Sequence, residues 1–295
     1  MKIKGFTEWR NHLPGLKGKK IAVIPILAFV SLLGTWTFYF SLNHLSRWFP
    51  TSFFIEVEPI LPLLGSLIGA ICAFSLVYSF FSRKEALLKK DKATAYEHGV
   101  KFGFVGIVII LATILYIYEP IIWFPLHLIS IPTPINPLTS ILSSSVFDLL
   151  FNRISSSENP FQVIFGLIFC VLGLLLIHQS VKLFGFDYVT AVYLYYPEES
   201  HLVDYKIYSI VRNPVYLGAL IVGFGGVLFR CSLYAAILFG VVCVFFLVHI
   251  HFVEDKELVD RFGTSFLEYT KKVPALFVSP KNWKQLLLFI FGKWD

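Results

Sequence analysis

Two short clusters hold the residues best suited to chemistry, and each lies beside a long apolar run. The first is VRNPVYLG at positions 211–218, in which Arg212 and Asn213 precede Pro214. Proline is favoured at the first position of a helix, so Arg212 and Asn213 fall at a helix N-terminus, where free backbone N–H groups attract a carboxylate or a phosphate. An ordinary helix start with an arginine that reaches lipid phosphates explains the same residues, so this motif alone leaves both interpretations open.

The second cluster, HIHFVEDKELVDRFGTSFLEY, follows the last long apolar run and occupies positions 249–269. If the helix continues, His251, Glu254, Asp255 and Leu258 lie on one face just outside the membrane. Two adjacent carboxylates at a membrane exit are costly to desolvate unless they meet a cation. The cluster is therefore either part of a cation-binding site or a solvated acidic patch balanced by neighbouring basic residues.

The composition indicates the kind of protein that must position these clusters. Of the 295 residues, 56% are hydrophobic and only 15% are charged, whereas charged residues usually make up about a quarter of a soluble domain. Apolar stretches of about 20 residues, enough to cross about 30 Å of hydrocarbon as a helix, recur along the chain. We predict an all-α, polytopic transmembrane helical bundle of about six spans, at residues 21–42, 60–81, 102–124, 161–181, 215–229 and 232–252. The last two are joined by a tight turn at Arg230 and Cys231, which predicts a C-terminal helical hairpin.

The lysines and arginines predict the orientation of the bundle. With a cytoplasmic N-terminus, only Arg47, Arg153 and Arg230 of the 25 basic residues fall on the opposite side of the membrane. This positive-inside bias favours an integral, multi-pass protein with its N- and C-termini in the cytoplasm. The membrane would be the plasma membrane in a prokaryote or the endoplasmic reticulum in a eukaryote. The loop before the hairpin and the tail after it, which hold the two polar clusters, then emerge on the same face.

Other kinds of site receive less support. The net charge of +6 comes from basic residues in loops between apolar runs, the distribution that membrane topology produces, so we expect no nucleic-acid partner. The four cysteines lie singly in or beside apolar segments, as small buried hydrophobic residues do. His249 and His251 point about 200° apart on a helix, which argues against joint metal binding. We therefore expect no metal.

Two further segments complete the organisation. Positions 125–160, rich in proline and serine, predict an external loop with an amphipathic turn near 147–151. The C-terminal NWKQLLLFIFGKW, at 282–294, has tryptophans at both ends, which suits a helix lying in the membrane interface; a seventh crossing is the alternative. We divide the chain into an N-terminal transmembrane region of about three spans plus the external loop at 1–160, and a core at 161–295.

Taken together, the two clusters resemble a known signature. YSIVRNPVYLG, a hairpin-sized gap and then EDKELVDRFGTSFLEYTKKVP are similar to the C-terminal signature of the isoprenylcysteine carboxyl methyltransferase and phospholipid methyltransferase superfamily. That signature is an arginine, a histidine or asparagine and PxYxG, followed by two carboxylates, a leucine, FGxxYxxY and VP. The upstream LVDYKIY also fits. The resemblance covers about 172–280, whereas the first three spans have no recognisable counterpart.

The resemblance implies an integral membrane methyltransferase that binds S-adenosylmethionine in a cytoplasm-facing pocket made by the loop, the hairpin and the tail. Carried over by position, Arg212 is the catalytic or substrate-orienting arginine, and Glu254 with Asp255 stands where the family has paired glutamates. Glu254 is the second catalytic candidate, as a proton acceptor. The other cofactor-binding residues expected from the resemblance and from the ring chemistry of tyrosine are Leu202, Val203, Tyr208, Asn213, Pro214, Tyr216, Leu217 and Gly218.

The sequence departs from the family pattern in four places. Asn213 replaces the commoner histidine, a variant known in prokaryotic members, so that position is not an obligatory proton acceptor. Asp255 replaces the second glutamate, and Phe266 replaces the first tyrosine of FGxxYxxY, so a hydroxyl is not essential there. Lys206 and Ile207 stand where a glycine and a small or proline residue are usual, so the loop backbone is expected to differ.

The physical chemistry of methyl transfer agrees with these residues. S-adenosylmethionine carries a sulfonium and an ammonium, which suit a carboxylate pair, and a carboxylate, which suits an arginine at a helix N-terminus. An in-line displacement at the methyl group needs no protein nucleophile, so holding the partners in contact in a dry pocket supplies much of the catalysis. The expected partners are membrane lipid and a lipophilic or prenylated substrate, most simply an isoprenylcysteine-type carboxylate. A phospholipid amine and another isoprenoid or quinone-like lipid remain as alternative acceptors.

Two other functions share this architecture. A sterol-type membrane reductase would bind NADPH, but such enzymes usually show a histidine after the arginine and a different acidic motif followed by KYG. A non-catalytic interaction or transport protein is the second alternative. Intramembrane charges would mark a transport path, and the predicted spans contain almost none.

Overall fold

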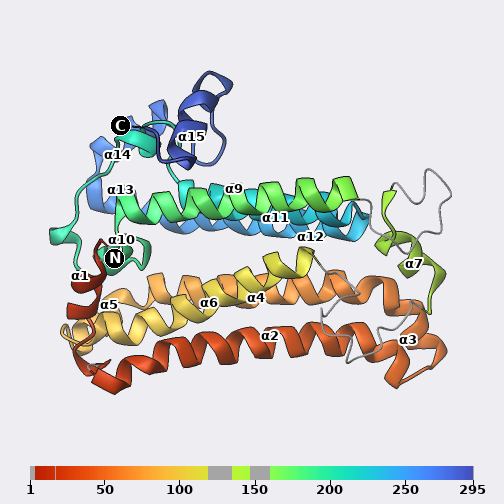
Figure 1. Ribbon diagram of the computed structural model, residues 1–295. Coiled ribbons are helices and arrows are strands. Elements are labelled where there is room, and N and C mark those ends of the chain that lie inside the picture. The colour runs from red at the N-terminus through yellow and green to blue at the C-terminus, as the bar shows by residue number, and fades with distance from the viewer. Residues whose placement is uncertain (1–3, 17, 119–134, 147–159, 295) are drawn as a thin grey trace.

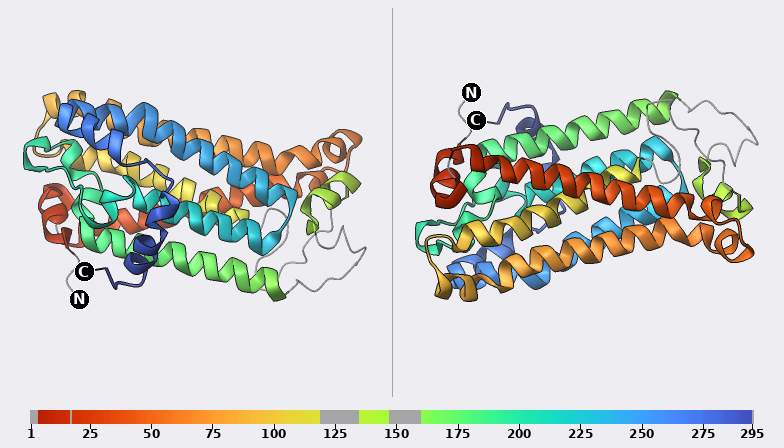
Figure 2. Two further views of the ribbon diagram at one scale, coloured as in Figure 1. Left: turned by 90° about the horizontal axis from the view of Figure 1, so that it is seen from above. Right: turned by 90° about the horizontal axis from the view of Figure 1, so that it is seen from below.

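The chain folds into a bundle of long helices (Figure 1). The computed structural model describes residues 4–16, 18–118, 135–146 and 160–294. The long helices among these residues are α2 (Val23–Trp48), α4 (Leu61–Ser82), α6 (Ala95–Ile117), α9 (Pro160–Phe184), α11 (Pro214–Arg230) and α12 (Leu233–His249). Short helices at the ends of the bundle are α1 (Phe6–Asn11), α3 (Ser52–Val57), α5 (Lys84–Lys90), α7 (Pro137–Ser143), α10 (Phe186–Val189), α13 (Asp255–Phe262), α14 (Thr264–Lys272) and α15 (Trp283–Ile290). Both views of Figure 2 show the long helices running along one common direction.

The long helices have the length and composition of membrane spans. Five helical stretches in the described part of the chain qualify: Lys20–Trp48, Ser52–Ser82, Ala95–Ile117, Pro160–Phe184 and Leu233–Phe262. α11 is a shorter apolar helix of 17 residues, and at about 1.5 Å per residue it is about 26 Å long, close to the thickness of the hydrocarbon layer. The predicted all-α polytopic bundle is therefore confirmed. The end of the predicted third span, most of the predicted external loop and the turn near 147–151 lie outside the described residues.

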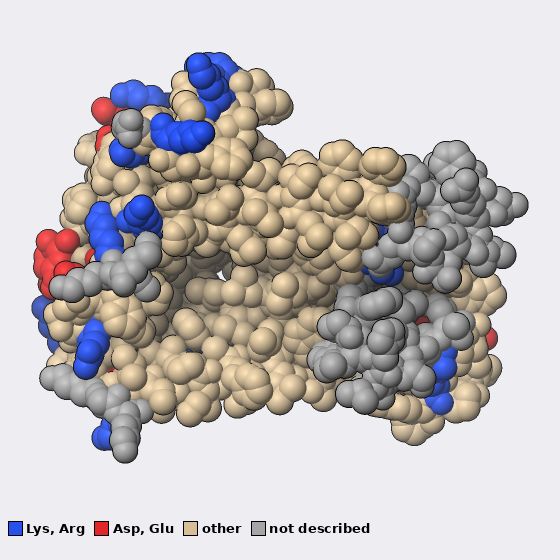
Figure 3. Space-filling view, in the orientation of Figure 1, with Lys and Arg blue, Asp and Glu red and all other residues tan. Residues whose placement is uncertain are grey.

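The two ends of the bundle differ in charge. The helices alternate in direction, so both chain termini lie at one end, together with α1, α5, α10, α13 and α14, while α3 and α7 lie at the other (Figure 1). Lysine and arginine side chains gather mainly at the end with the termini, and a wide belt without charged side chains separates the two ends on the face shown in Figure 3. This is the charge asymmetry from which we predict the membrane orientation.

α11 packs closely along α9 through glycines that face each other. A Cβ atom on Gly173 would lie 2.6 Å from the carbonyl oxygen of Gly218, and one on Gly218 would lie 2.9 Å from that of Gly173. Gly166 and Gly225 form a second reciprocal pair, at 2.9 and 2.8 Å. Small residues allow helix backbones to approach in membranes, where packing rather than the hydrophobic effect holds helices together. The contact fixes the N-terminus of α11 relative to the C-terminus of α9.

The predicted hairpin between α11 and α12 is present. α11 ends at Arg230, and Cys231 adopts a left-handed conformation with φ 49°. The side chain of Ser232 then caps α12 by accepting a hydrogen bond from the backbone N–H of Ala235 at 3.3 Å. A single left-handed residue followed by a serine cap reverses the chain without a long loop.

Two pairs of polar side chains inside the bundle form hydrogen bonds between α2 and α6. The hydroxyl groups of Tyr39 in α2 and Thr113 in α6 lie 2.6 Å apart, and the Tyr116 hydroxyl donates to Asn43 at 2.9 Å. Unpaired polar groups are costly in hydrocarbon, so these hydrogen bonds specify how α2 packs on α6. Through α6 they connect the N-terminal spans to the hairpin, since α6 contacts both α11 and α12.

Candidate functional site

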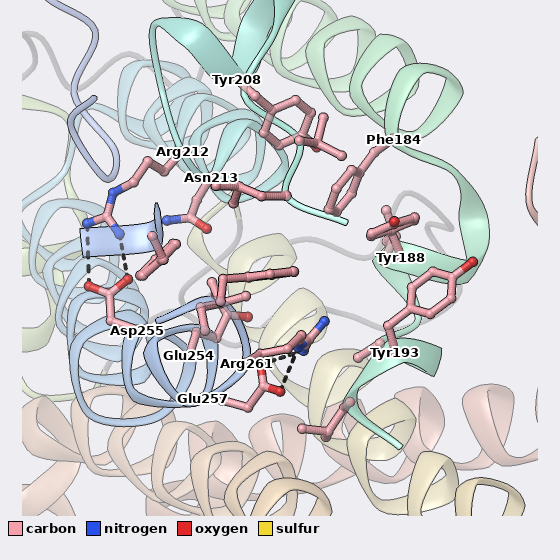
Figure 4. Close-up of a pocket in the computed structure, with 18 of the residues that line it drawn as sticks. Phe184, Tyr188, Tyr193, Tyr208, Arg212, Asn213, Glu254, Asp255, Glu257 and Arg261 are labelled. Atoms are coloured by element: carbon pink, nitrogen blue, oxygen red, sulfur yellow. Dashed lines mark hydrogen bonds and ion pairs between the residues drawn. The ribbon is translucent and has the colours of Figure 1, made fainter. Parts of the chain in front are cut away.

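A cavity of about 200 Å³ opens at the end of the bundle that carries both termini (Figure 4). Its lining comes from the ends of α4 and α9, from α10 and the residues that follow it, from the loop that runs into the start of α11, and from the segment between Glu254 and α14. Both clusters that the sequence singled out therefore meet in one cavity, together with a third wall that the sequence did not reveal.

The C-terminal tail holds the loop before α11 by backbone hydrogen bonds. The N–H groups of Arg212 and Asn213 donate to the carbonyls of Pro274 and Ala275, at 2.9 and 3.1 Å. The Tyr269 hydroxyl donates to the carbonyl of Tyr208 at 2.5 Å, and burial raises the pKa of Tyr269, which keeps this donor protonated. The last tyrosine of the signature, Tyr269, and the VP that follows it thus position the loop that contains Arg212, Asn213 and Pro214, which we call the RNP loop.

Arg212 forms an ion pair across the cavity with Asp255. Its Nη1 and Nη2 atoms lie 2.6 and 3.4 Å from the two carboxylate oxygens, and the guanidinium lies over the ring of Phe266, 5.5 Å from its centre. The side chains are only 11% and 25% exposed, so the pair is largely shielded from solvent. The aromatic residue that replaces the first tyrosine of FGxxYxxY therefore packs beneath the arginine.

Glu254 is held by a tyrosine and a histidine. One of its carboxylate oxygens, Oε1, accepts a hydrogen bond from the Tyr216 hydroxyl and lies 3.2 Å from Nε2 of His249. His249 is buried, and its Nδ1 finds no hydrogen-bond partner among the described residues. Two donors on one oxygen fix the carboxylate at the cavity wall.

The expectation of one continuous α-helical face from His251 to Leu258 is wrong. Residues Ile250–Glu254 form a π-helical turn, which changes the angular position of everything after it. His251 is exposed on the outside, whereas His249 reaches Glu254 five positions later. Single π-helical turns are rare and are frequent at functional sites. The adjacent carboxylates consequently have separate partners. Glu254 contacts two residues of the hairpin, Tyr216 and His249, and Asp255 contacts Arg212 in the loop before α11.

An aromatic wall from α9, α10 and the following residues forms the third side of the cavity. The ring of Phe184 lies 4.8 Å from that of Tyr208, and the Tyr188 hydroxyl lies 2.8 Å from Nδ1 of His201. Tyr193 donates a short hydrogen bond to the buried carboxylate of Asp187. Burial raises the pKa of both Tyr188 and Tyr208, so their hydroxyl groups stay protonated at neutral pH.

A second ion pair lines the cavity beside this wall. Arg261 Nε and Nη2 donate to the two carboxylate oxygens of Glu257 at 2.9 and 2.5 Å. Both residues come from α13, one turn apart, a spacing typical of helix ion pairs. The sequence contains this i, i+4 signal, but nothing in it indicates that the pair faces a cavity.

The cavity includes most of the residues expected to bind a cofactor. Those that line it are Leu202, Val203, Tyr208, Arg212, Asn213, Pro214, Tyr216, Glu254 and Asp255. Leu217 and Gly218 lie outside the lining: Leu217 packs in an apolar cluster with α9 and the loop, and Gly218 contacts α9. The residues that sequence reasoning missed include Phe81, Phe184, Tyr188, Tyr193, His201, Glu257 and Arg261 in the lining and His249, which contacts Glu254.

The arrangement suits a small ligand that carries both apolar and charged groups. Aromatic rings supply apolar faces that also attract cations, and Glu254 supplies a fixed negative charge. In the described part of the chain, no three or more His, Cys, Asp or Glu side chains come together as a metal site. Fold and site together define a polytopic membrane protein with a ligand cavity at one end of its helix bundle.

Part of this chain is similar to known proteins. Residues 161–265 match the sequence model of the phospholipid methyltransferase family. Two curated relatives from Arabidopsis thaliana, protein-S-isoprenylcysteine O-methyltransferases B and A, are 31% and 29% identical over 111 residues, which is 38% of this chain and 56% of each relative. The chain thus spans about half the length of these relatives. No solved structure gives a significant match. The predicted resemblance to the isoprenylcysteine carboxyl methyltransferase and phospholipid methyltransferase superfamily is confirmed.

Proposed function

We propose that this chain is an integral membrane methyltransferase that transfers a methyl group from S-adenosylmethionine to a lipophilic acceptor. One observation carries the proposal: the two halves of the family signature line the same cavity. Arg212 and Asn213 enter it from the start of α11, and Glu254 and Asp255 enter it where α12 passes into α13. The match to the phospholipid methyltransferase family, residues 161–265, includes the start of α11 and both carboxylates.

The side chains around the cavity suit the chemistry of this cofactor. Glu254 offers a carboxylate to an ammonium or sulfonium group, and the rings of Phe184, Tyr188 and Tyr208 offer faces to adenine or to a cation. When bound, S-adenosylmethionine supplies an activated methyl group that passes in line to the acceptor while sulfur keeps the bonding electron pair. The residues of the chain hold the acceptor in line and exclude water.

For the acceptor we propose an isoprenylcysteine-type carboxylate. Asp255 occupies the Nη atoms of Arg212, while the Nε atom is buried and finds no hydrogen-bond partner among the described residues. A carboxylate that approaches Arg212 can take up this free donor, which would orient one of its oxygens toward the methyl group. Formation of a methyl ester from a carboxylate releases no proton, so Asn213 in place of a histidine costs the reaction nothing.

A phospholipid amine is the second candidate acceptor, and the match to the phospholipid methyltransferase family favours it. An amine must lose a proton to become nucleophilic, and Glu254 is a group in the cavity wall able to accept one. The two candidates give chemically different products. Base releases the methyl group of an ester as methanol but leaves an N-methyl group in place.

Ligand-dependent melting tests the proposed function. We expect S-adenosylhomocysteine at about 100 times its Kd to stabilise the purified full-length protein in detergent by about 2.7 kcal/mol, a rise of several degrees in Tm. NADPH should have no effect. Glu254→Ala should lose the stabilisation, whereas Glu268→Ala, which removes an exposed glutamate of α14, should keep it. Incubation with labelled S-adenosylmethionine and N-acetyl-S-farnesylcysteine should then yield a base-labile methyl group.

Other outcomes would replace the proposal. Stabilisation by NADPH alone would indicate the reductase, and stabilisation by neither ligand would indicate a non-catalytic protein. Normal binding by Glu254→Ala would place the cofactor elsewhere. Base-stable label in phospholipid, without label in the farnesylcysteine, would make the acceptor an amine.

A further inference from the structure

The N-terminal segment, residues 4–16, lies against the chain that forms the aromatic wall of the cavity. α1 packs beside α10 at the end of the bundle that holds both termini (Figure 1). This segment precedes the first long helix and is far outside residues 161–265, which match the phospholipid methyltransferase family.

Lys4 joins the two segments by backbone and side-chain hydrogen bonds. Its carbonyl accepts from the N–H of Phe186 at 2.8 Å, and its Nζ donates to the carbonyl of Leu183 at 2.6 Å. Leu183 lies in the last turn of α9, where carbonyls lack helical partners and a lysine is favourable. Lys4 thus fixes the point at which the chain leaves α9 for the cavity wall.

Aromatic and apolar side chains extend this contact. The ring of Trp9 meets that of Phe186 edge to face at 5.1 Å, and Phe6 lies 5.4 Å from Trp9. Leu13 and Leu16 are buried in the same cluster as residues 192, 194 and 195 of the wall. Such a cluster buries enough apolar surface to hold a short segment that has little regular structure of its own.

The C-terminal part of residues 4–16 makes further contacts, with the residues after the wall and with α6. The His12 ring lies 4.2 Å from that of Tyr196, and its Nε2 atom lies 3.4 Å from a carboxylate oxygen of Glu199. The N–H of Gly15 donates to the buried carboxylate of Glu97 in α6 at 2.7 Å. The segment therefore connects the wall to the membrane-spanning part of the bundle.

The wall needs support from outside because its own backbone is unfavourable. Ala191 has φ 55°, a left-handed conformation that residues with a Cβ rarely adopt. Around it, residues 188, 189, 191, 193 and 194 line the cavity. Contacts from elsewhere must stabilise this conformation, and the N-terminal segment supplies many of them.

We propose that residues 4–16 are a positioning element of the cofactor pocket: they hold the wall that carries Tyr188 and Tyr193 in the conformation that binds S-adenosylmethionine. The inference rests on the proposed function. It means that the segment matching the family does not form the complete pocket by itself. The N-terminal segment completes the pocket, although Lys4 and its contact Leu183 are 179 residues apart in the sequence.

Substitution of Trp9 in the full-length protein tests this inference. If Trp9→Ala leaves the wall correctly placed in about a tenth of the molecules, the Kd for S-adenosylhomocysteine and the KM for S-adenosylmethionine should rise about tenfold. The KM for the lipid acceptor should not change. Trp9→Phe, which keeps an aromatic contact, should restore most of the affinity. Hydrogen exchange of the backbone at 186–196 should be faster in Trp9→Ala than in the wild type or in Trp9→Phe. If Trp9→Ala does not fold, Phe6→Ala, a milder change at the edge of the cluster, takes its place in the same measurements.

Tyr39→Ala provides the matched control. It removes a buried aromatic ring from the middle of the bundle, far from the wall, so it should lower Tm without changing the Kd. If Trp9→Ala and Phe6→Ala bind S-adenosylhomocysteine like the wild type, or if Tyr39→Ala weakens binding equally, the inference is wrong. Failure of the wild type itself to bind S-adenosylhomocysteine would instead contradict the proposed function.

Discussion

The position of Glu254 depends on a local change in helix geometry. In an α-helix, residues five apart point about 140° away from each other, so His249 could not reach Glu254. The π-helical turn at Ile250–Glu254 brings them to 3.2 Å and directs the carboxylate to the oxygen of Tyr216. The helical pair Glu257 and Arg261, by contrast, needs only ordinary α-helical spacing.

Replacement of His249 tests whether this contact matters for binding. His249→Leu fits the surrounding rings of Phe81 and Phe245 but removes the donor to Glu254. A hydrogen bond to a charged group contributes about 1.5–3 kcal/mol, so we expect at least about tenfold weaker binding of S-adenosylhomocysteine by calorimetry. His249→Gln keeps an N–H donor and should retain most of the affinity.

The two variants also separate positioning from proton transfer. If His249→Gln binds the cofactor normally but its turnover is lost, the histidine moves a proton rather than holding Glu254. Wild-type affinity in His249→Leu would show that Tyr216 alone positions the carboxylate.

At the residue scale, sequence reasoning found the half of the cavity that lies in the signature. Arg212, Asn213 and Glu254 were predictable because their order and spacing are specific. Tyr188 and His201 were not, because each is an unremarkable residue until the fold brings the loops together. His249 was missed for a different reason: the prediction assumed α-helical periodicity through a segment that is π-helical.

Among the helices, the glycine contact between α9 and α11 determines where the RNP loop begins. The carbonyls at Gly173 and Gly218 leave no room for a methyl group on the facing residue. The sequence predicted both spans, but Gly218 was assigned to the cofactor site from its place in the family signature. A single sequence does not show which face of α11 meets α9. In the structure Gly218 packs against α9 and is not among the residues that line the cavity.

Gly173→Ala should therefore destabilise the protein and displace the start of α11. Overpacking of a close contact costs about 1–3 kcal/mol, and we expect a lower Tm together with weaker binding of S-adenosylhomocysteine in melting scans. Gly240→Ala is the matched control, since a Cβ on Gly240 of α12 has nothing within 4 Å. It should raise Tm or leave it unchanged, because alanine favours a helix over glycine by about 1 kcal/mol. Equal melting of the two variants would contradict a packing role for Gly173.

The C-terminal helix shows a limit of pattern analysis at the same scale. α15 buries Phe289 and Ile290 in the apolar cluster that includes Leu176 of α9, and it leaves Trp283 and Leu287 exposed. The tryptophans at both ends of this segment predicted a helix lying in the membrane interface. They did not predict that residues of this helix would pack on the bundle.

For the whole molecule, composition and basic residues were sufficient to predict a bundle whose termini share one end. Apolar runs of membrane length and tight turns leave a chain few other ways to pair its backbone groups in hydrocarbon. The contacts of residues 4–16 with the cavity wall could not be predicted, because they join segments that are distant in sequence and carry no shared pattern. The division into residues 1–160 and 161–295 stays a prediction.

The orientation of the whole molecule decides whether the cavity can meet its cofactor. Positive charge predicts that the end carrying α5, α13 and both termini faces the cytoplasm, where S-adenosylmethionine is made. A single cysteine can be placed at each end of a cysteine-free variant: Lys92→Cys beside α5, and Thr51→Cys before α3, both exposed positions. In intact bacterial cells that carry the protein in the plasma membrane, a membrane-impermeant maleimide should label Thr51→Cys at once and Lys92→Cys only after permeabilisation. The reverse pattern would place the cavity outside the cell, out of reach of the cofactor, and a methyltransferase that draws on cytoplasmic S-adenosylmethionine could not work in that orientation.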